Sequence, residues 1–205
     1  SPETSGNNIE MTENKLNNTS PQNNLNPFLE GKLNSRKTIN LVRPWNPDLG
    51  LKKFGLAWTR DVQFSKKTIT LRHLNWNYNK VGVKDAYYPG IDKFLTSKPF
   101  FKENKLLVEV DNPDYQNFFA KLVNSKIKEL DNASDGVMLD WWNDNQPIYK
   151  GNKQTVNKAR RGIAKAVREE IGLQKIILAN VNGNKDKGTV QYLNGVFFEL
   201  SKSGK

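Results

Sequence analysis

The chain has 205 residues, a formal net charge of +11, no cysteine and a single histidine. Disulfide bonds and cysteine-ligated metal sites are therefore excluded, and a zinc site is disfavoured. No apolar run approaches the length of a membrane span, and the polar start SPETSGNNIE lacks the apolar segment of a signal peptide.

The positive charge is compatible with binding to nucleic acid, to anionic glycans or to membrane surfaces. The lysines are scattered along the chain rather than clustered, which favours a solvated basic surface and argues against nucleic acid as the partner. An extracellular or cell-envelope location is compatible with this composition. Because the chain starts at Ser1 rather than Met, we expect a processed or excised fragment.

Residues 1–36 are rich in Asn, Ser, Thr and Pro, so we expect a disordered tail or linker that cannot bury a core. The folded domain would then span residues 37–205. After three short strands, residues 77–104 have no clean period and are expected to form a long aromatic loop. The three strands are predicted at residues 37–42, 54–58 and 68–76.

Strands alternate with helices from residue 106 onward. Residues 106–110 (LLVEV) predict a strand, after which Asn112 and Pro113 suit the N-cap and first position of a helix. The apolar spacing predicts a second amphipathic helix over residues 156–171, with Gly172 as its C-cap. The remaining strands are predicted at residues 137–140, 175–179 and 195–198.

This order of elements predicts βαβ units and a parallel sheet, which fits either a doubly wound sheet or a (β/α)8 barrel. No glycine-rich phosphate-binding motif opens any of the helices, which favours the barrel. A complete barrel needs ~250 residues. We therefore predict an α/β fold of the TIM-barrel type that is incomplete at its C-terminus, with five or six strands present.

Two predicted strands end in a carboxylate. DGVMLD ends at Asp140 and NGVFFE at Glu199, and parallel strands would bring both acids to one rim of a barrel. Hydrolysis of a glycosidic bond needs such a pair, one as acid and the other as nucleophile or base. Trp141, Trp142 and Tyr88 would supply flat apolar surfaces for sugar rings. Either acid could instead cap a helix or pair with one of the many bases.

Other polar residues lie at or near predicted strand ends. Asp111 suits either the site or the start of the next helix, whereas Asn180 and Asn182 suit either hydrogen bonds to substrate hydroxyls or turn formation. His73 on a predicted strand is more typical of a packed or surface residue than of a catalyst. No cofactor or metal is predicted, although Asp144, next to the acid-tipped strand, leaves a Mg²⁺ or Ca²⁺ site open.

Four segments carry a family resemblance: LLVEVDNPDYQNFF, DGVMLDWWND, ILANVNGN and YLNGVFFEL. They resemble uncharacterised TIM-barrel glycoside hydrolases of bacterial and phage genomes, which are similar in turn to the endo-α-1,4-polygalactosaminidase group. The resemblance covers residues 54–200. It implies that Asp140 and Glu199 are the catalytic carboxylates and that Asp111 and Asn180 occupy matching strand ends. The family continues beyond the point where this sequence stops.

We therefore expect a glycoside hydrolase that cleaves O-glycosidic bonds of a polysaccharide or oligosaccharide, with Asp140 as nucleophile or base and Glu199 as general acid. The alternative is a non-catalytic carbohydrate-binding domain, in which the same aromatic rim binds sugar and the acids only accept hydrogen bonds from hydroxyl groups. A third and weaker interpretation is a basic nucleic-acid binder. The sequence predicts neither the glycan nor the stereochemical outcome, and it leaves open which of the two carboxylates is the acid and which the nucleophile or base.

Overall fold

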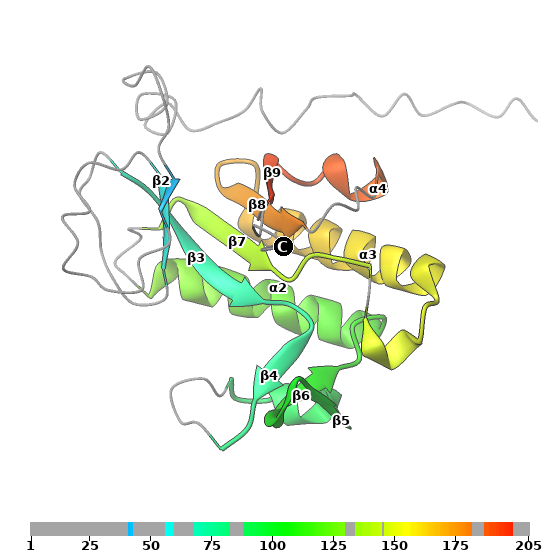
Figure 1. Ribbon diagram of the computed structural model, residues 1–205. Coiled ribbons are helices and arrows are strands. Elements are labelled where there is room, and N and C mark those ends of the chain that lie inside the picture. The colour runs from blue at the N-terminus through cyan, green and yellow to red at the C-terminus, as the bar shows by residue number, and fades with distance from the viewer. Residues whose placement is uncertain are drawn as a thin grey trace, which may run out of the picture.

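The computed structural model describes residues 41–42, 56–59, 68–82, 88–129, 134–144, 146–181 and 187–198 (Figure 1). The expected tail, residues 1–36, lies outside this part of the chain. Among the helices that the structure describes, none is both long and apolar enough to cross a membrane.

The larger of two sheets is six-stranded, and every neighbouring pair of its strands is parallel. The strands lie side by side in the order in which they occur along the chain. The six strands predicted outside residues 106–110 each overlap one of them. They are β1 (Leu41–Val42), β2 (Leu56–Thr59), β3 (Ile69–Asn75), β7 (Gly136–Asp140), β8 (Ile176–Val181) and β9 (Gly195–Phe198).

The smaller sheet is antiparallel, has the order β4–β6–β5, and is inserted between β3 and the first long helix. The prediction that residues 106–110 belong to the parallel sheet is wrong, because Leu106 and Leu107 lie on β6 and pair with β4. A short apolar run looks the same in either kind of sheet. Residues 77–104, expected as a loop, contribute β4 (Tyr78–Lys80), the 3-10 helix η4 (Ile91–Phe94), β5 (Leu95–Phe100) and the start of β6 (Lys102–Val108).

Two long helices, α2 (Pro113–Lys128) and α3 (Lys153–Ile171), confirm the helix predictions. Each begins at an asparagine, Asn112 or Asn152, whose side chain accepts a backbone N–H of the first turn. Helix α3 ends at Gly172, whose φ of 71° lies in the left-handed region that glycine tolerates. Two short helices complete the described part: η5 (Pro147–Tyr149) and α4 (Lys187–Val190).

Both long helices pack on the same face of the parallel sheet. Their buried residues form one core with Val137, Leu139 and Ile177 of β7 and β8, and Figure 1 shows both helices behind the sheet. Strands in chain order joined by crossovers of one hand place successive helices on one face. The described strands are therefore singly wound, without the order reversal of a doubly wound sheet. Among them no pairing joins β9 to β1, so the sheet is open.

The start of β7 is fixed between its two neighbours. The Asp135 carboxylate accepts the Thr70 N–H at 2.9 Å, and the Asp135 N–H donates to the Thr70 carbonyl at 2.7 Å. A Cβ added to Gly136 would lie 1.9 Å from the carbonyl oxygen of Ile176. The Asp-Gly pair thus allows β7 to lie between β3 and β8 with no steric conflict.

A buried arginine joins the end of α3 to the strands that follow. The Arg168 guanidinium donates to the carbonyl oxygens of Gly172 and Lys175, both at 2.8 Å, and to Asn194 Oδ1 at 2.6 Å. Burial lowers the pKa of this guanidinium to about 10, so it remains charged at neutral pH. Asn194 Oδ1 also accepts the Ile177 N–H at 2.8 Å, so Arg168 fixes the loop before β9 against the start of β8.

We expect Arg168→Met to lower the free energy of unfolding by about 3 kcal/mol, because it leaves buried carbonyl groups without their charged donor. Denaturant unfolding followed by circular dichroism measures this. Lys165→Met on the same helix is the matched control: its ion pair with Glu169 spans 3.7 Å between exposed side chains and contributes roughly 0.5 kcal/mol or less. Equal effects of the two substitutions would contradict the role assigned to Arg168.

Candidate active site

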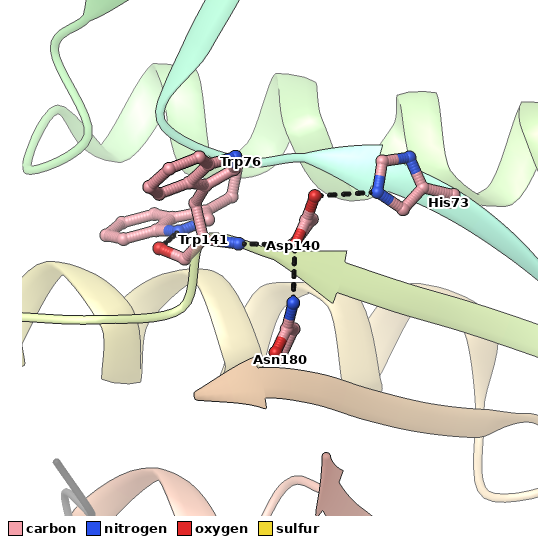
Figure 2. A network of polar contacts seen from close by, with 5 residues as sticks. All are labelled: His73, Trp76, Asp140, Trp141 and Asn180. Atoms are coloured by element: carbon pink, nitrogen blue, oxygen red, sulfur yellow. Dashed lines mark hydrogen bonds and ion pairs between the residues drawn. The ribbon is translucent and has the colours of Figure 1, made fainter. Parts of the chain in front are cut away.

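A cluster of buried polar side chains lies at the carboxyl edge of the parallel sheet, around Asp140 (Figure 2). Asp140 is the last residue of β7, is 6% exposed, and is in register with Asn75 of β3. Alternate residues of a strand share a face, so His73 lies on the same face as Asn75. On the other side, β8 brings Asn180 to the same level. Three adjacent strands thus converge on one carboxylate.

Both oxygens of the Asp140 carboxylate accept hydrogen bonds. Oδ2 lies 2.8 Å from His73 Nε2, whereas Oδ1 accepts from Asn180 Nδ2 at 2.8 Å and from the backbone N–H of Trp141 at 3.0 Å. His73 donates here only if Nε2 carries a proton, which holds for its neutral Nε2–H form and for the imidazolium. Donors aimed at both oxygens favour the ionised carboxylate.

The turn after Asp140 is fixed by backbone hydrogen bonds. Trp141 adopts a left-handed conformation with φ 59°, which turns its N–H back to the preceding carboxylate. Its carbonyl oxygen accepts the indole N–H of Trp76 at 2.8 Å, and the Trp142 N–H donates to the Asn180 carbonyl at 2.9 Å. A bulky residue with positive φ is strained, so these contacts hold Trp141 in a conformation that it would otherwise avoid.

The two adjacent tryptophans lie in different environments. Trp142 is 1% exposed and packs in the core against Trp76, with ring centroids 4.8 Å apart. This burial does not fit the sugar-stacking role expected for Trp142 from the sequence. Trp141 is partly exposed and contacts Phe100 and Phe101 of the small antiparallel sheet and its β5–β6 turn. Of these two tryptophans, Trp141 is therefore the one that presents its ring near the edge where Asp140 lies.

Asp111 and Tyr88, also predicted to bind substrate, make other contacts. The Asp111 carboxylate accepts the hydroxyl proton of Tyr149. Burial, and then this hydrogen bond, raise the pKa of the Tyr149 hydroxyl well above its ordinary value, so it stays a donor. Tyr88 packs partly buried against the main core, with Lys126 Nζ 5.5 Å from its ring centroid. No described contact joins either residue to Asp140.

Two residues named from the sequence, Glu199 and Asn182, lie outside the described residues. Asp144, the residue that left a cation site open, forms an ion pair with Lys153 at 3.3 Å. Among the described residues, no group of three or more potential ligands is placed to hold a metal ion.

His73 and Asn75 are site residues that sequence reasoning missed. His73 was given a packing role, yet its side chain contacts Asp140. Asn75 is in register with Asp140, and its Oδ1 atom is buried without a hydrogen-bond partner in the described part of the chain. Their spacing of two residues near the end of a predicted strand was the available signal, because the ends of parallel strands meet at one edge.

We expect Asn180→Asp to destabilise the fold in a pH-dependent way, because it places a second carboxylate within hydrogen-bond distance of Asp140. Such a pair binds a proton more tightly when folded than when unfolded, so the stability of the variant falls as pH rises above the normal carboxyl range. Thermal unfolding at about pH 5 and pH 8 should show a larger deficit at the higher pH. Asn180→Ala, which adds no charge, should show a deficit that changes much less with pH; an Asn180→Asp deficit independent of pH would contradict the geometry.

No protein-family model and no curated protein matches the chain. Among solved structures it is similar to Ega3 of Aspergillus fumigatus in complex with galactosamine, with a TM-score of 0.50 and 9% identity, covering 78% of this chain and 65% of that one. It is also similar to the glycoside hydrolase domain of PelA from Pseudomonas aeruginosa, with a TM-score of 0.48 and 12% identity, covering 71% of this chain and 60% of that one. The chain thus spans about 65% of the length of the first neighbour. The fold is glycoside hydrolase-like, as the sequence motifs predicted.

Proposed function

We propose that the chain is a glycoside hydrolase that cleaves O-glycosidic bonds of a polysaccharide through a pair of carboxyl groups. The observation that carries the proposal is the buried Asp140 carboxylate, held by three hydrogen bonds at the carboxyl edge of a singly wound parallel sheet. Active sites of singly wound α/β barrels lie at this edge. A buried carboxylate that is fixed in place and kept ionised is suited to attack a sugar carbon or to activate water.

The hydrogen bonds support one role for Asp140 within the proposed pair. A nucleophile or base must be ionised, and Asn180 Nδ2 and the Trp141 N–H, which both donate to Oδ1, favour that form of the carboxyl. Asp140 is therefore the nucleophile or base. Asn180 and His73 hold the carboxylate in one orientation. The reaction therefore does not have to restrict the rotation of this group.

Glu199 is the proposed general acid. It directly follows Phe198, the last residue of β9, and β9 is parallel to β8 with Phe197 in register with Asn180. Glu199 comes two positions after Phe197 in the sequence, which is the spacing at which residues of one strand share a face. β7 and β9 lie two strand spacings apart, roughly 10 Å, which is near the upper end of the ~6.5–9.5 Å between the paired carboxyls of inverting glycosidases.

We assign more limited roles to the other residues that the sequence predicted to bind substrate. Trp141 is the proposed sugar platform, because it is partly exposed and directly follows Asp140. Asn75, with a buried unpaired Oδ1 beside Asp140, is suited to accept a hydrogen bond from a substrate hydroxyl. Asn182, which directly follows β8 in the sequence, remains a candidate. Asp111 and Tyr88 would contact only a longer glycan, since their described contacts lie elsewhere.

The proposed architecture is a partial (β/α)8 barrel over residues 37–205. Its support is the chain-order strand sequence, the packing of α2 and α3 on one face, and the likeness to Ega3. The other face carries a second apolar cluster from four adjacent strands, which would be the barrel interior. This cluster comprises Leu56, Ile69, Leu71, Met138 and Ile176.

A panel of glycans assayed for new reducing ends tests the proposed hydrolysis. Where the wild type cleaves a glycan, we expect Asp140→Asn and Glu199→Gln each to reduce the rate by at least about 100-fold, since each removes a group that acts in the transition state. The matched control is Asp144→Asn, four residues after Asp140 and engaged with Lys153, which should retain activity within about threefold.

The same panel decides between the enzyme and the non-catalytic carbohydrate-binding domain. A wild type that binds glycans without cleaving any of them supports the binding domain and rejects the hydrolase. Loss of activity in Asp144→Asn together with loss in a chelator would instead indicate a metal-dependent site.

A further inference from the structure

Two aromatic residues next to the candidate site share an unusual backbone conformation. Phe101 has a φ of 60° and Trp141 a φ of 59°, both in the left-handed region that bulky side chains rarely adopt. The residues lie on separate segments, the β5–β6 turn and the turn after β7, yet their ring centroids are 5.4 Å apart. Strained residues persist where the surrounding structure enforces them, and they gather at ligand sites.

These two rings belong to a larger group that we call the rim aromatic cluster, comprising Tyr78, Phe100, Phe101 and Trp141. Phe100 lies at its centre, stacked on Tyr78 at 4.7 Å and in edge contact with Trp141 at 5.3 Å. Phe101 packs on Phe100 at 4.4 Å, but 76% of its own surface is exposed. An exposed phenylalanine backed by buried rings is a preformed flat apolar surface.

The rim aromatic cluster begins at the catalytic edge and leads away from it. Trp141 directly follows Asp140, and β4, which carries Tyr78, begins three residues after β3 ends at Asn75. Trp141 therefore lies next to the carboxylate, Phe100 and Phe101 lie beyond it, and Tyr78 lies beyond Phe100. A linear ligand with one unit at Asp140 would pass over this surface with its next units.

The small antiparallel sheet that supports the cluster is strongly basic. Its three strands carry four lysines and one acid, Glu103. Lys105 Nζ lies 5.1 Å from the Tyr78 ring centroid, Lys80 is directly opposite Lys105 in register, and Lys102 directly follows Phe101. Lysine ammonium groups beside an aromatic surface are suited to attract the anionic groups of a ligand.

We propose that the rim aromatic cluster and its lysines bind an acidic glycan, one that carries carboxylates as uronate residues do. Sugar rings stack on Phe101 and Trp141, and the lysines of the small sheet hold the carboxylates. The inference rests on the proposed function, since it takes the carboxyl edge of the sheet as the glycan site. It also predicts discrimination against amino sugars, whose protonated amines the lysines repel.

Binding of three oligosaccharides of equal length tests the inference: a galacturonate hexamer, a neutral cellulose hexamer and a glucosamine hexamer. The full-length Asp140→Asn variant is titrated in a calorimeter, so that cleavage does not interfere. We expect the galacturonate hexamer to bind at least about tenfold more tightly than the glucosamine hexamer at low salt. This preference should shrink between about 0.02 M and about 0.3 M salt, because salt screens the charges of the lysines and of the glycan.

Two sets of variants in the same Asp140→Asn background separate stacking from charge. Phe101→Ala should weaken galacturonate binding about tenfold, whereas Phe101→Tyr keeps the flat ring and should restore it. Leu173→Ala, an exposed apolar residue just after α3, is the matched control and should change binding less than about twofold. Replacing both Lys102 and Lys105 by Gln should remove the preference for the acidic hexamer, while Lys158→Gln on α3 should leave it intact.

Unchanged binding in Phe101→Ala, or a glucosamine hexamer that binds as well as the galacturonate hexamer, would overturn the inference. These outcomes are independent of turnover. If the acidic hexamer binds as described and the wild type cleaves no glycan, the proposed hydrolysis fails and the binding surface stands. If the wild type cleaves a glycan without using Phe101 or the lysines, the hydrolysis stands and the binding surface fails.

Discussion

The burial of the Asp140 carboxylate is the constraint to which the surrounding structure conforms. A buried carboxylate loses its hydration at a cost of several kcal/mol unless protein donors replace the water. Here the donors come from β3, from β8 and from the turn after β7. The register of three strands and the left-handed backbone of Trp141 are therefore coupled to one charge. The other end of β7 is built similarly, with the Asp135 carboxylate on the Thr70 N–H and Gly136 against Ile176.

The turn after β7 also explains why Trp141 and Trp142 lie in different environments. With the Trp141 N–H bound to Asp140 and its carbonyl bound to Trp76, the chain reverses so that the Trp141 ring meets Phe100 while the Trp142 ring enters the core. Trp76 supports both, since its indole N–H fixes Trp141 and its ring packs on Trp142. Its own carbonyl accepts the hydroxyl of Tyr115 on α2 at 2.5 Å, which ties the turn to the helix layer.

Local signals predicted α2, α3 and the strands of the parallel sheet, because caps and short apolar runs act within a few residues. Asn180 was predicted at the end of a strand, where it could bind a substrate hydroxyl, but its hydrogen bond to Asp140 was not predicted. The signals that failed were non-local. His73 lies 67 positions from Asp140 in the sequence, and β6 pairs with β4, which lies in a stretch without periodicity. The positive φ of Phe101 follows from the β5–β6 turn. It could not be predicted from the sequence, because phenylalanine is not a residue type that favours this conformation.

The position of the small antiparallel sheet places the aromatic surface and its lysines to one side of Asp140. It follows β3, whose His73 holds Asp140, so the loops of two adjacent strands deliver the reactive carboxylate and the aromatic surface. A negatively charged Asp140 repels a sugar carboxylate placed directly beside it. Lys105 Nζ lies next to Tyr78, and Phe100 lies between Tyr78 and Trp141. In this arrangement Lys105 binds acidic groups on sugar units that lie away from the bond that is cleaved. The aromatic rings lie between the positive charge of Lys105 and the negative charge of Asp140.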